Sequence, residues 1–189
     1  MKIGLIADSH IPEAMPELPS EIRAVFSDVD RILHAGDLHC LEVLDWLEDL
    51  APVVACRGNG DEGSGGREIV PEDSRLHETA VTVCDGYTIG LVHDVLDPEE
   101  HSHWPIERTM QHYFHCRTDI IVCGHTHVER VQRYGTVLVI NPGSPTYPHN
   151  YAAQLGTVGL LTLEESSRIL VQIVDLKTLA VIPELSYAG

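Results

Sequence analysis

The chain has 189 residues, of which 43% are hydrophobic, and a formal charge of −17. This length and composition predict one soluble globular domain over residues 1–189, large enough to bury a core of its own. Because 29 acidic side chains outnumber 12 basic ones, the surface repels phosphate backbones and anionic lipids, which argues against general nucleic-acid or membrane binding.

The first third of the chain predicts alternating strands and helices. Residues 2–7 are short, apolar and near-continuous, as in a parallel strand that is buried on both faces. A helix that begins near Pro19-Ser20-Glu21 follows, and then a strand over 30–35, a helix over 40–50 and a strand over 52–56. This order predicts β-α-β crossovers, which place parallel strands side by side.

The rest of the chain predicts mainly strands and hairpins. Asp85-Gly86 lies between two β-prone runs, 79–84 and 87–92, and such a pair is a strong turn signal. The remaining expected elements, in chain order, are a helix over 105–115, a strand over 120–123, a hairpin of 128–134 with 136–140, and strands over 158–163 and 169–176. We find no linker or internal repeat between them.

Polar side chains follow five of these strands. Asp8 and His10 alone are compatible with an ordinary polar loop, but the coincidence at five strand ends favours a ligand site, because ligands bind at the carboxyl ends of such strands. His125-x-His127 could direct both rings into one pocket if that segment is extended. The candidate ligands are Asp8, His10, Asp37, Asn59, His93, His125 and His127.

These donors are oxygens and imidazoles without a thiolate, which suits manganese, iron, zinc or nickel better than calcium. The set is too large for one ion. It would suit two ions roughly 3.5–4 Å apart that share a bridging carboxylate.

The motifs, in this order along the chain, resemble those of the calcineurin-like metallophosphoesterase superfamily, and its small bacterial phosphodiesterases in particular. The matching segments are Asp8-Ser9-His10, Gly36-Asp37, Gly58-Asn59, His93, Gly124-His125-Thr126-His127 and Asn141-Pro142-Gly143-Ser144. The resemblance implies an α/β (α+β) fold: a four-layer αββα sandwich of two mixed β-sheets flanked by helices. It also implies one metal ion on Asp8, His10 and His127, a second on Asn59, His93 and His125, and Asp37 bridging the two.

The function that the resemblance implies is hydrolysis of a small or nucleotide-like phosphoester, more readily a diester than a monoester. A hydroxide that bridges two divalent ions, with manganese expected first, would attack phosphorus, and Asp37 and Asn59 would act through the metals. The alternative is a protein-binding scaffold, because one retromer subunit resembles the same fold. Because all seven ligand positions carry side chains that can bind metal, the sequence favours the enzyme. Both the enzyme and the scaffold are compatible with a homo-oligomer.

Three residues near the motifs, His39, Arg57 and Asp61, each have two alternative roles. Many larger relatives carry a histidine directly after the motif asparagine, where this chain has Gly60, so esters with poor leaving groups should react slowly. His39 is a candidate replacement acid, or else a solvated loop residue. Arg57 is a candidate ligand for the substrate phosphate, or else a surface residue, and Asp61 could support the site or cap a loop.

The five cysteines form no Cys-x-x-Cys pair, which disfavours a disulfide framework and suits a reducing compartment. No apolar run approaches the roughly 20 residues of a membrane span. Because Lys2 is followed directly by a strand pattern, we expect no signal peptide and a cytoplasmic location.

Overall fold

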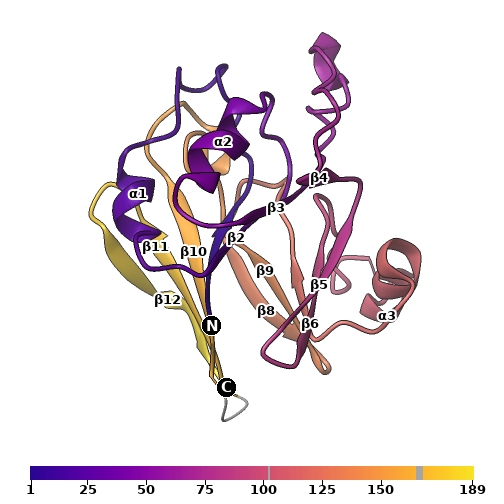
Figure 1. The fold of residues 1–189 in the computed structure, drawn as a ribbon. Coiled ribbons are helices and arrows are strands. Elements are labelled where there is room, and N and C mark those ends of the chain that lie inside the picture. Colours follow the sequence, from indigo (N-terminus) through magenta and orange to yellow (C-terminus); the bar gives the residue numbers. More distant parts are fainter. Residues whose placement is uncertain (102, 165–167) are drawn as a thin grey trace.

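The computed structural model describes residues 1–101, 103–164 and 168–189, and in these residues two β-sheets face each other (Figure 1). The larger sheet contains, in spatial order, β12 (Ala180–Ala188), β11 (Arg168–Asp175), β10 (Thr157–Glu164), β1 (Lys2–Ile6), β2 (Arg31–His34), β3 (Val53–Cys56) and β4 (Leu76–His77). The smaller sheet contains β5 (Ala80–Cys84), β6 (Tyr87–Leu91), β7 (Ile120–Val122), β9 (Val137–Asn141) and β8 (Arg130–Tyr134).

Both sheets are mixed, as expected. Strands β1 to β4 are parallel to one another, whereas β10, β11 and β12 are joined by antiparallel pairing. In the smaller sheet β6, β7 and β9 are parallel, and β5 and β8 pair antiparallel at the two edges. The parallel strands β1, β2 and β3 are those of the predicted β-α-β crossovers.

Helices cover the outer faces of the two sheets, so the predicted four-layer architecture is confirmed. Helices α1 (Glu21–Val25) and α2 (Glu42–Glu48) share one apolar cluster with the larger sheet. Helix α3 (Ile106–Thr109) continues into a π-helical turn, Met110–Phe114, and packs on the smaller sheet. A third cluster, from both sheets, fills the space between them.

Strand β1 is buried on both faces, as its apolar run predicted. Ile3 and Leu5 lie in the cluster between the sheets, whereas Ile6 lies in the cluster under the helices. Gly4 also faces the helices, and a Cβ added there would lie 3.1 Å from the ring of Phe26. The glycine therefore allows α1 to approach the sheet closely.

The structure corrects several predicted boundaries. Helix α2 and strand β8 are shorter than the expected 40–50 and 128–134, and β4 and β12 were not expected at all. Strand β12 contains Pro183 and pairs with β11 through a bulge, and its side chains are mostly exposed. Such an edge strand lacks the apolar alternation from which a strand is predicted.

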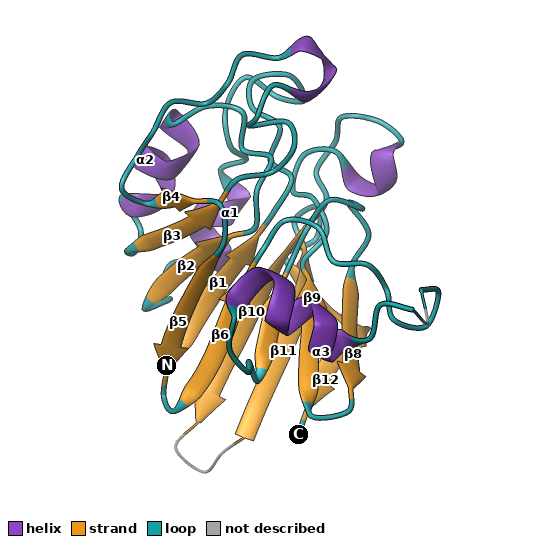
Figure 2. Ribbon diagram, turned by 90° about the vertical axis from the view of Figure 1, so that its right-hand side faces the viewer, coloured by secondary structure: helices purple, strands orange, loops and turns teal. Residues whose placement is uncertain are grey.

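The carboxyl ends of β1, β2, β3, β6 and β7 meet at one end of the sandwich, where the loops gather (Figure 2). Two 3₁₀ turns lie in these loops, η1 (Ser64–Gly66) after β3 and η3 (Pro148–Asn150) after β9. Among the helices of the described residues, none is long and apolar enough to cross a membrane.

Candidate metal centre

The loops that leave these strands turn sharply at the predicted ligands. Six residues there have φ between 47° and 71°: Asp8, His10, Asp37, His39, His125 and His127. Non-glycine residues rarely adopt this left-handed conformation, and it concentrates at functional sites. The segment His125-x-His127 is not extended; instead, the left-handed conformations of His125 and His127 aim both imidazoles into the site.

The first cluster contains Asp8, His10 and His127, whose candidate ligand atoms all lie within 4.8 Å of one another. One Asp8 oxygen accepts the backbone N–H of His125 at 3.0 Å. Nδ1 of His127 donates to the carbonyl of Tyr147 at 2.7 Å, which turns Nε2 toward Asp8 Oδ1, 3.7 Å away. This group matches the set that the resemblance assigned to one ion.

The second cluster lies on the other side of the site. The buried His93 donates from Nδ1 to the carbonyl of Ala35 at 2.8 Å, which leaves Nε2 3.3 Å from Nδ1 of His125. His125 Nδ1 also lies 3.1 Å from Oδ1 of Asn59, and both of these residues are exposed. The structure therefore brings Asn59, His93 and His125 together as a second group.

Asp37 lies between the two clusters. Its Oδ2 is 3.5 Å from Nε2 of His10 and 3.5 Å from Nε2 of His93. Its Oδ1 accepts the backbone N–H of Gly60 at 2.7 Å, which fixes the plane of the carboxylate. All seven predicted ligands thus belong to one continuous constellation, with a carboxylate at its centre.

Burial and mutual charge shift the acidities in this constellation. Burial raises the pKa of Asp8 to about 8 and lowers that of His10 to about 3. For His93, burial acts to lower the pKa, but the hydrogen bond to Asp37 and the charges of Asp8 and Asp37 raise it to about 9. Burial would raise the pKa of Asp37, yet His93 holds it below its usual range.

Asp61 supports the site from beneath. It is fully buried, and its carboxylate accepts backbone N–H bonds from Asp37 at 2.9 Å, His39 at 2.8 Å and Gly58 at 2.8 Å. The same carboxylate therefore ties the loop after β2 to the loop after β3. For Asp61 the sequence allowed two alternative roles, supporting the site or capping a loop, and these hydrogen bonds favour the first.

Other hydrogen bonds fix the ligand loops from residues that the sequence analysis did not assign. The amide of Asn141 donates to the carbonyl of Gly124 at 2.7 Å, and the hydroxyl of Ser144 donates to the carbonyl of Asp8 at 2.7 Å. The motif after β9 therefore holds two ligand loops together. In the sequence, only the hydrogen-bonding side chains of Asn141 and Ser144 indicated that this motif could hold neighbouring loops in place.

Arg57 and His39 occupy different surroundings. The Arg57 side chain is 5% exposed and donates to the carbonyls of Val70 and Pro71, so its guanidinium holds the loop before β4. The His39 side chain is 4% exposed, with Nδ1 3.6 Å from the carboxylate of Glu13. We therefore retain His39, but not Arg57, as a candidate for contact with substrate.

A family model for the calcineurin-like phosphoesterase superfamily domain matches residues 1–166. The chain belongs to this superfamily. A probable metallophosphoesterase of Methanothermobacter thermautotrophicus is 35% identical over 148 residues, which cover 78% of this chain and 79% of that protein. A phosphodiesterase of Methanocaldococcus jannaschii is 27% identical over 170 residues, covering 87% and 95%.

Solved structures match the fold. The zinc complex of Vps29 from Entamoeba histolytica superposes with a TM-score of 0.72 at 23% identity, covering 100% of this chain and 98% of that one. At this identity the similarity shows that the two chains share a fold, and no more.

The donor set of this calcineurin-like phosphoesterase fits divalent cations. Oδ2 of Asp8 and Nε2 of His10 are buried without a hydrogen-bond partner among the described residues, although buried polar atoms are normally paired. His93 and His127 each bind a backbone carbonyl through Nδ1 and direct Nε2 inward, which is how metal-binding histidines are usually oriented.

Cation binding is expected to weaken as the pH falls. Because the pKa of His93 is raised to about 9 and that of Asp8 to about 8, a cation at neutral pH has to displace protons from both groups. The apparent affinity for Mn²⁺ should therefore rise with pH until it levels off near the higher of these pKa values, with proton release on binding. Calorimetry in buffers of different ionisation enthalpy measures both, and a pH-independent affinity would contradict the expectation.

Proposed function

We propose that this protein is a phosphodiesterase that uses two divalent cations. The observation that carries the proposal is the position of the Asp37 carboxylate, 3.5 Å from a ring nitrogen of each histidine cluster. It supports one ion on Asp8, His10 and His127, a second on Asn59, His93 and His125, and Asp37 between them. Two such cations lower the pKa of water and neutralise phosphoryl oxygens in the transition state.

The protein residues around these ligands hold the donors in place. Asp37, together with Asp8 once a cation has displaced its proton, supplies negative charge, and Asn59 supplies a neutral oxygen at the exposed side, where we place the incoming phosphoester. We propose manganese as the working ion, with iron, zinc and nickel also suited to these ligands. The free cysteines support action in a reducing cytoplasm.

We further propose that His39 protonates the leaving group. A Cβ added to Gly60 would collide with Nε2 of His39, so this imidazole fills the space that a side chain at position 60 would occupy. The two ring nitrogens of His39 are buried without hydrogen-bond partners among the described residues. Burial lowers the pKa of His39, whereas the charges of Asp37, Asp61 and Glu13 act to raise it. Nε2 is the nitrogen that would pass a proton to the departing alkoxide oxygen, while Nδ1 faces Glu13.

His39→Gln is expected to slow hydrolysis of alkyl phosphodiesters, whose leaving groups are poor, by roughly 10²–10⁴-fold. Diesters with a p-nitrophenyl leaving group need less protonation and should lose far less. The measurement is kcat for a series of diesters of graded leaving-group basicity, with His77→Gln on the exposed face of β4 as the control. Equal losses across the series would exclude the proton donor.

The function itself is tested with the purified protein and added Mn²⁺. We expect hydrolysis of bis(p-nitrophenyl) phosphate that depends on the metal and exceeds that of the monoester, p-nitrophenyl phosphate. Inactivity on both esters with manganese, iron, zinc and nickel would rule the proposal out.

A protein-binding scaffold is the second candidate, because the match to Vps29 spans the whole chain. The competent donors at all ligand positions favour the enzyme over the scaffold. Inactivity in the same assay would move the assignment to the scaffold.

A further inference from the structure

A cavity of about 330 Å³ opens beside the first histidine cluster. Its wall includes His10, a predicted metal ligand, together with Glu13, Arg67, Tyr147 and Asn150. The volume lies at the lower end of the roughly 300–1,000 Å³ of small-molecule sites. The cavity therefore offers room for an organic group attached to a phosphate at the metal centre.

Arg67 is the cation in this wall. It follows η1, and its Nε donates to both oxygens of Glu13, at 2.8 and 3.0 Å. Nη1 donates to the carbonyl of Ser64 at 2.9 Å, and for Nη2 there is no bond within the part of the chain described here. Since a guanidinium has five N–H donors, Arg67 retains donors for a further acceptor.

The loop around η1 is shaped to hold this guanidinium. Gly65 has a φ of 71°, and a Cβ added there would lie 2.8 Å from Nη1 of Arg67. A side chain at this position would displace the arginine. The glycine thus lets the guanidinium lie over the turn, facing the cavity.

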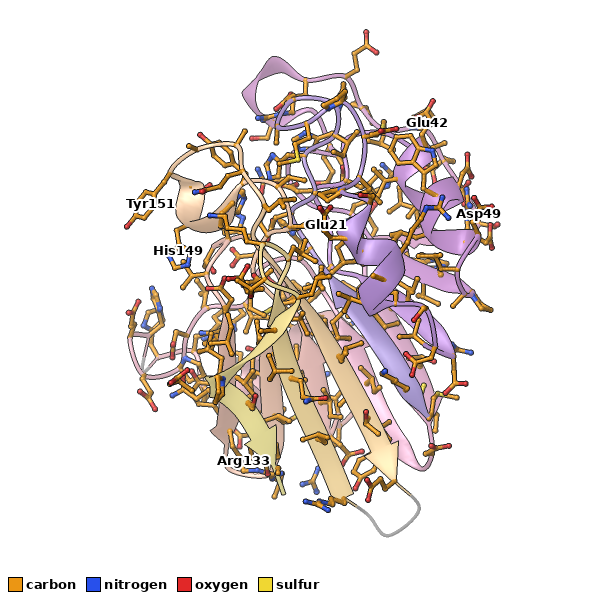
Figure 3. The ribbon with its side chains drawn as sticks, turned by 90° about the vertical axis from the view of Figure 1, so that its left-hand side faces the viewer. Glu21, Glu42, Asp49, Arg133, His149 and Tyr151 are labelled. Carbon is orange, nitrogen blue, oxygen red and sulfur yellow. The ribbon has the colours of Figure 1, made fainter. Side chains whose placement is uncertain are left out.

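Another part of the wall comes from the loop of η3. The ring of Tyr147 lies 6.4 Å from the ring of His10 and 5.9 Å from that of His127, between centroids, so an aromatic side chain of the wall lies beside two of the predicted metal ligands. The Asn150 amide is held by the carbonyl of Thr126 at 3.2 Å. Tyr151, at the end of the same turn, points away from the molecule (Figure 3).

We infer that this cavity binds the second ester substituent of the substrate, and that Arg67 binds an anionic group on it. The inference rests on the proposed function and narrows its substrate class to phosphodiesters with an additional carboxylate or phosphate. In a chain of charge −17, a doubly anionic substrate needs a local positive charge on its path to the centre. In the free protein, the guanidinium of Arg67 is paired with the Glu13 carboxylate. When substrate binds, the same guanidinium would donate hydrogen bonds to both Glu13 and the substrate anion.

The test compares two diesters with a common p-nitrophenyl leaving group, in which the second substituent is either ethyl or 2-carboxyethyl. The readout is the ratio of kcat/KM for the carboxyethyl ester to kcat/KM for the ethyl ester, with Mn²⁺ added. Arg67→Gln should lower this ratio about tenfold or more, because it removes a charge-assisted hydrogen bond. Arg67→Lys should keep part of it, and Arg117→Gln, which removes an exposed arginine, should keep all of it.

The variant Glu13→Gln distinguishes two roles of Arg67: binding the substrate anion, or only holding two loops together through its ion pair with Glu13. If Arg67 binds the substrate anion, removal of the competing carboxylate should raise the ratio, opposite to the effect of Arg67→Gln. If the pair only holds two loops together, the two variants should act in the same direction. An unchanged ratio in Arg67→Gln, or parallel losses in the two variants, overturns the inference.

A binding measurement tests the role of Arg67 even if the protein does not hydrolyse phosphodiesters. Calorimetry with a non-hydrolysable phosphonate that carries the carboxyethyl group should show about tenfold weaker binding to Arg67→Gln than to the unaltered protein. If neither ester is hydrolysed, the proposed function fails, and the binding difference still supports the cavity. Equal affinities overturn the inference whether or not hydrolysis occurs.

Discussion

Asp37→Asn is expected to lower phosphodiester hydrolysis by at least roughly a hundredfold, which is the scale of losing a well-placed electrostatic group. The carboxylate lies 3.5 Å from both His10 and His93, so its charge serves both halves of the site. Asparagine keeps an acceptor for the N–H of Gly60 and tolerates the left-handed φ of 55°. The loss therefore comes from the charge and not from a distorted loop.

The measurement pairs kcat for bis(p-nitrophenyl) phosphate with the number of manganese ions bound. We expect weaker binding of both ions in Asp37→Asn, and the same loss of activity when the unaltered protein is treated with EDTA. Asp49→Asn, at the exposed end of α2, is the matched control and should behave like the unaltered protein. Full activity in EDTA would contradict the whole metal-dependent mechanism.

Much of the fold follows from short patterns. The apolar run of β1 predicted a strand buried on both faces, and Ile3 and Ile6 do lie in different clusters. The Asp85-Gly86 turn predicted the hairpin of β5 and β6. Strand β12 was missed because it gains its place from pairing with β11, and its own side chains are largely exposed. Backbone pairing with the preceding strand holds β12 in the sheet without apolar alternation in its own sequence.

The site was predicted as a set of residues but not as a geometry. The strand-end rule collected the seven candidate ligands, because the carboxyl ends of neighbouring parallel strands share one edge. It did not reveal that Asp8, Asp37 and His125 sit in left-handed turns, since nothing local in the sequence demands that conformation of Asp or His. The contact of His39 with Gly60 also depends on how two loops meet.

Asp61→Ala is expected to destabilise the fold by roughly 3 kcal/mol, because two buried N–H groups and one partly buried N–H group would each lose their acceptor. The donors belong to Asp37, Gly58 and His39, which lie on two different loops. For a chain of this length, such a loss corresponds to a fall in Tm of roughly 10 °C. Asp61→Asn keeps one carbonyl oxygen and should lose less.

Thermal unfolding followed by circular dichroism measures the loss, with Asp49→Ala on the surface of α2 as the control (Figure 3). An exposed substitution of this kind usually changes stability by no more than about 0.5 kcal/mol. Because Asp61 also sets the backbone of Asp37, the same variant should bind manganese more weakly even where it remains folded. If Asp61→Ala unfolded at the temperature of the control and bound metal normally, the two loops would have to be joined by contacts other than this carboxylate.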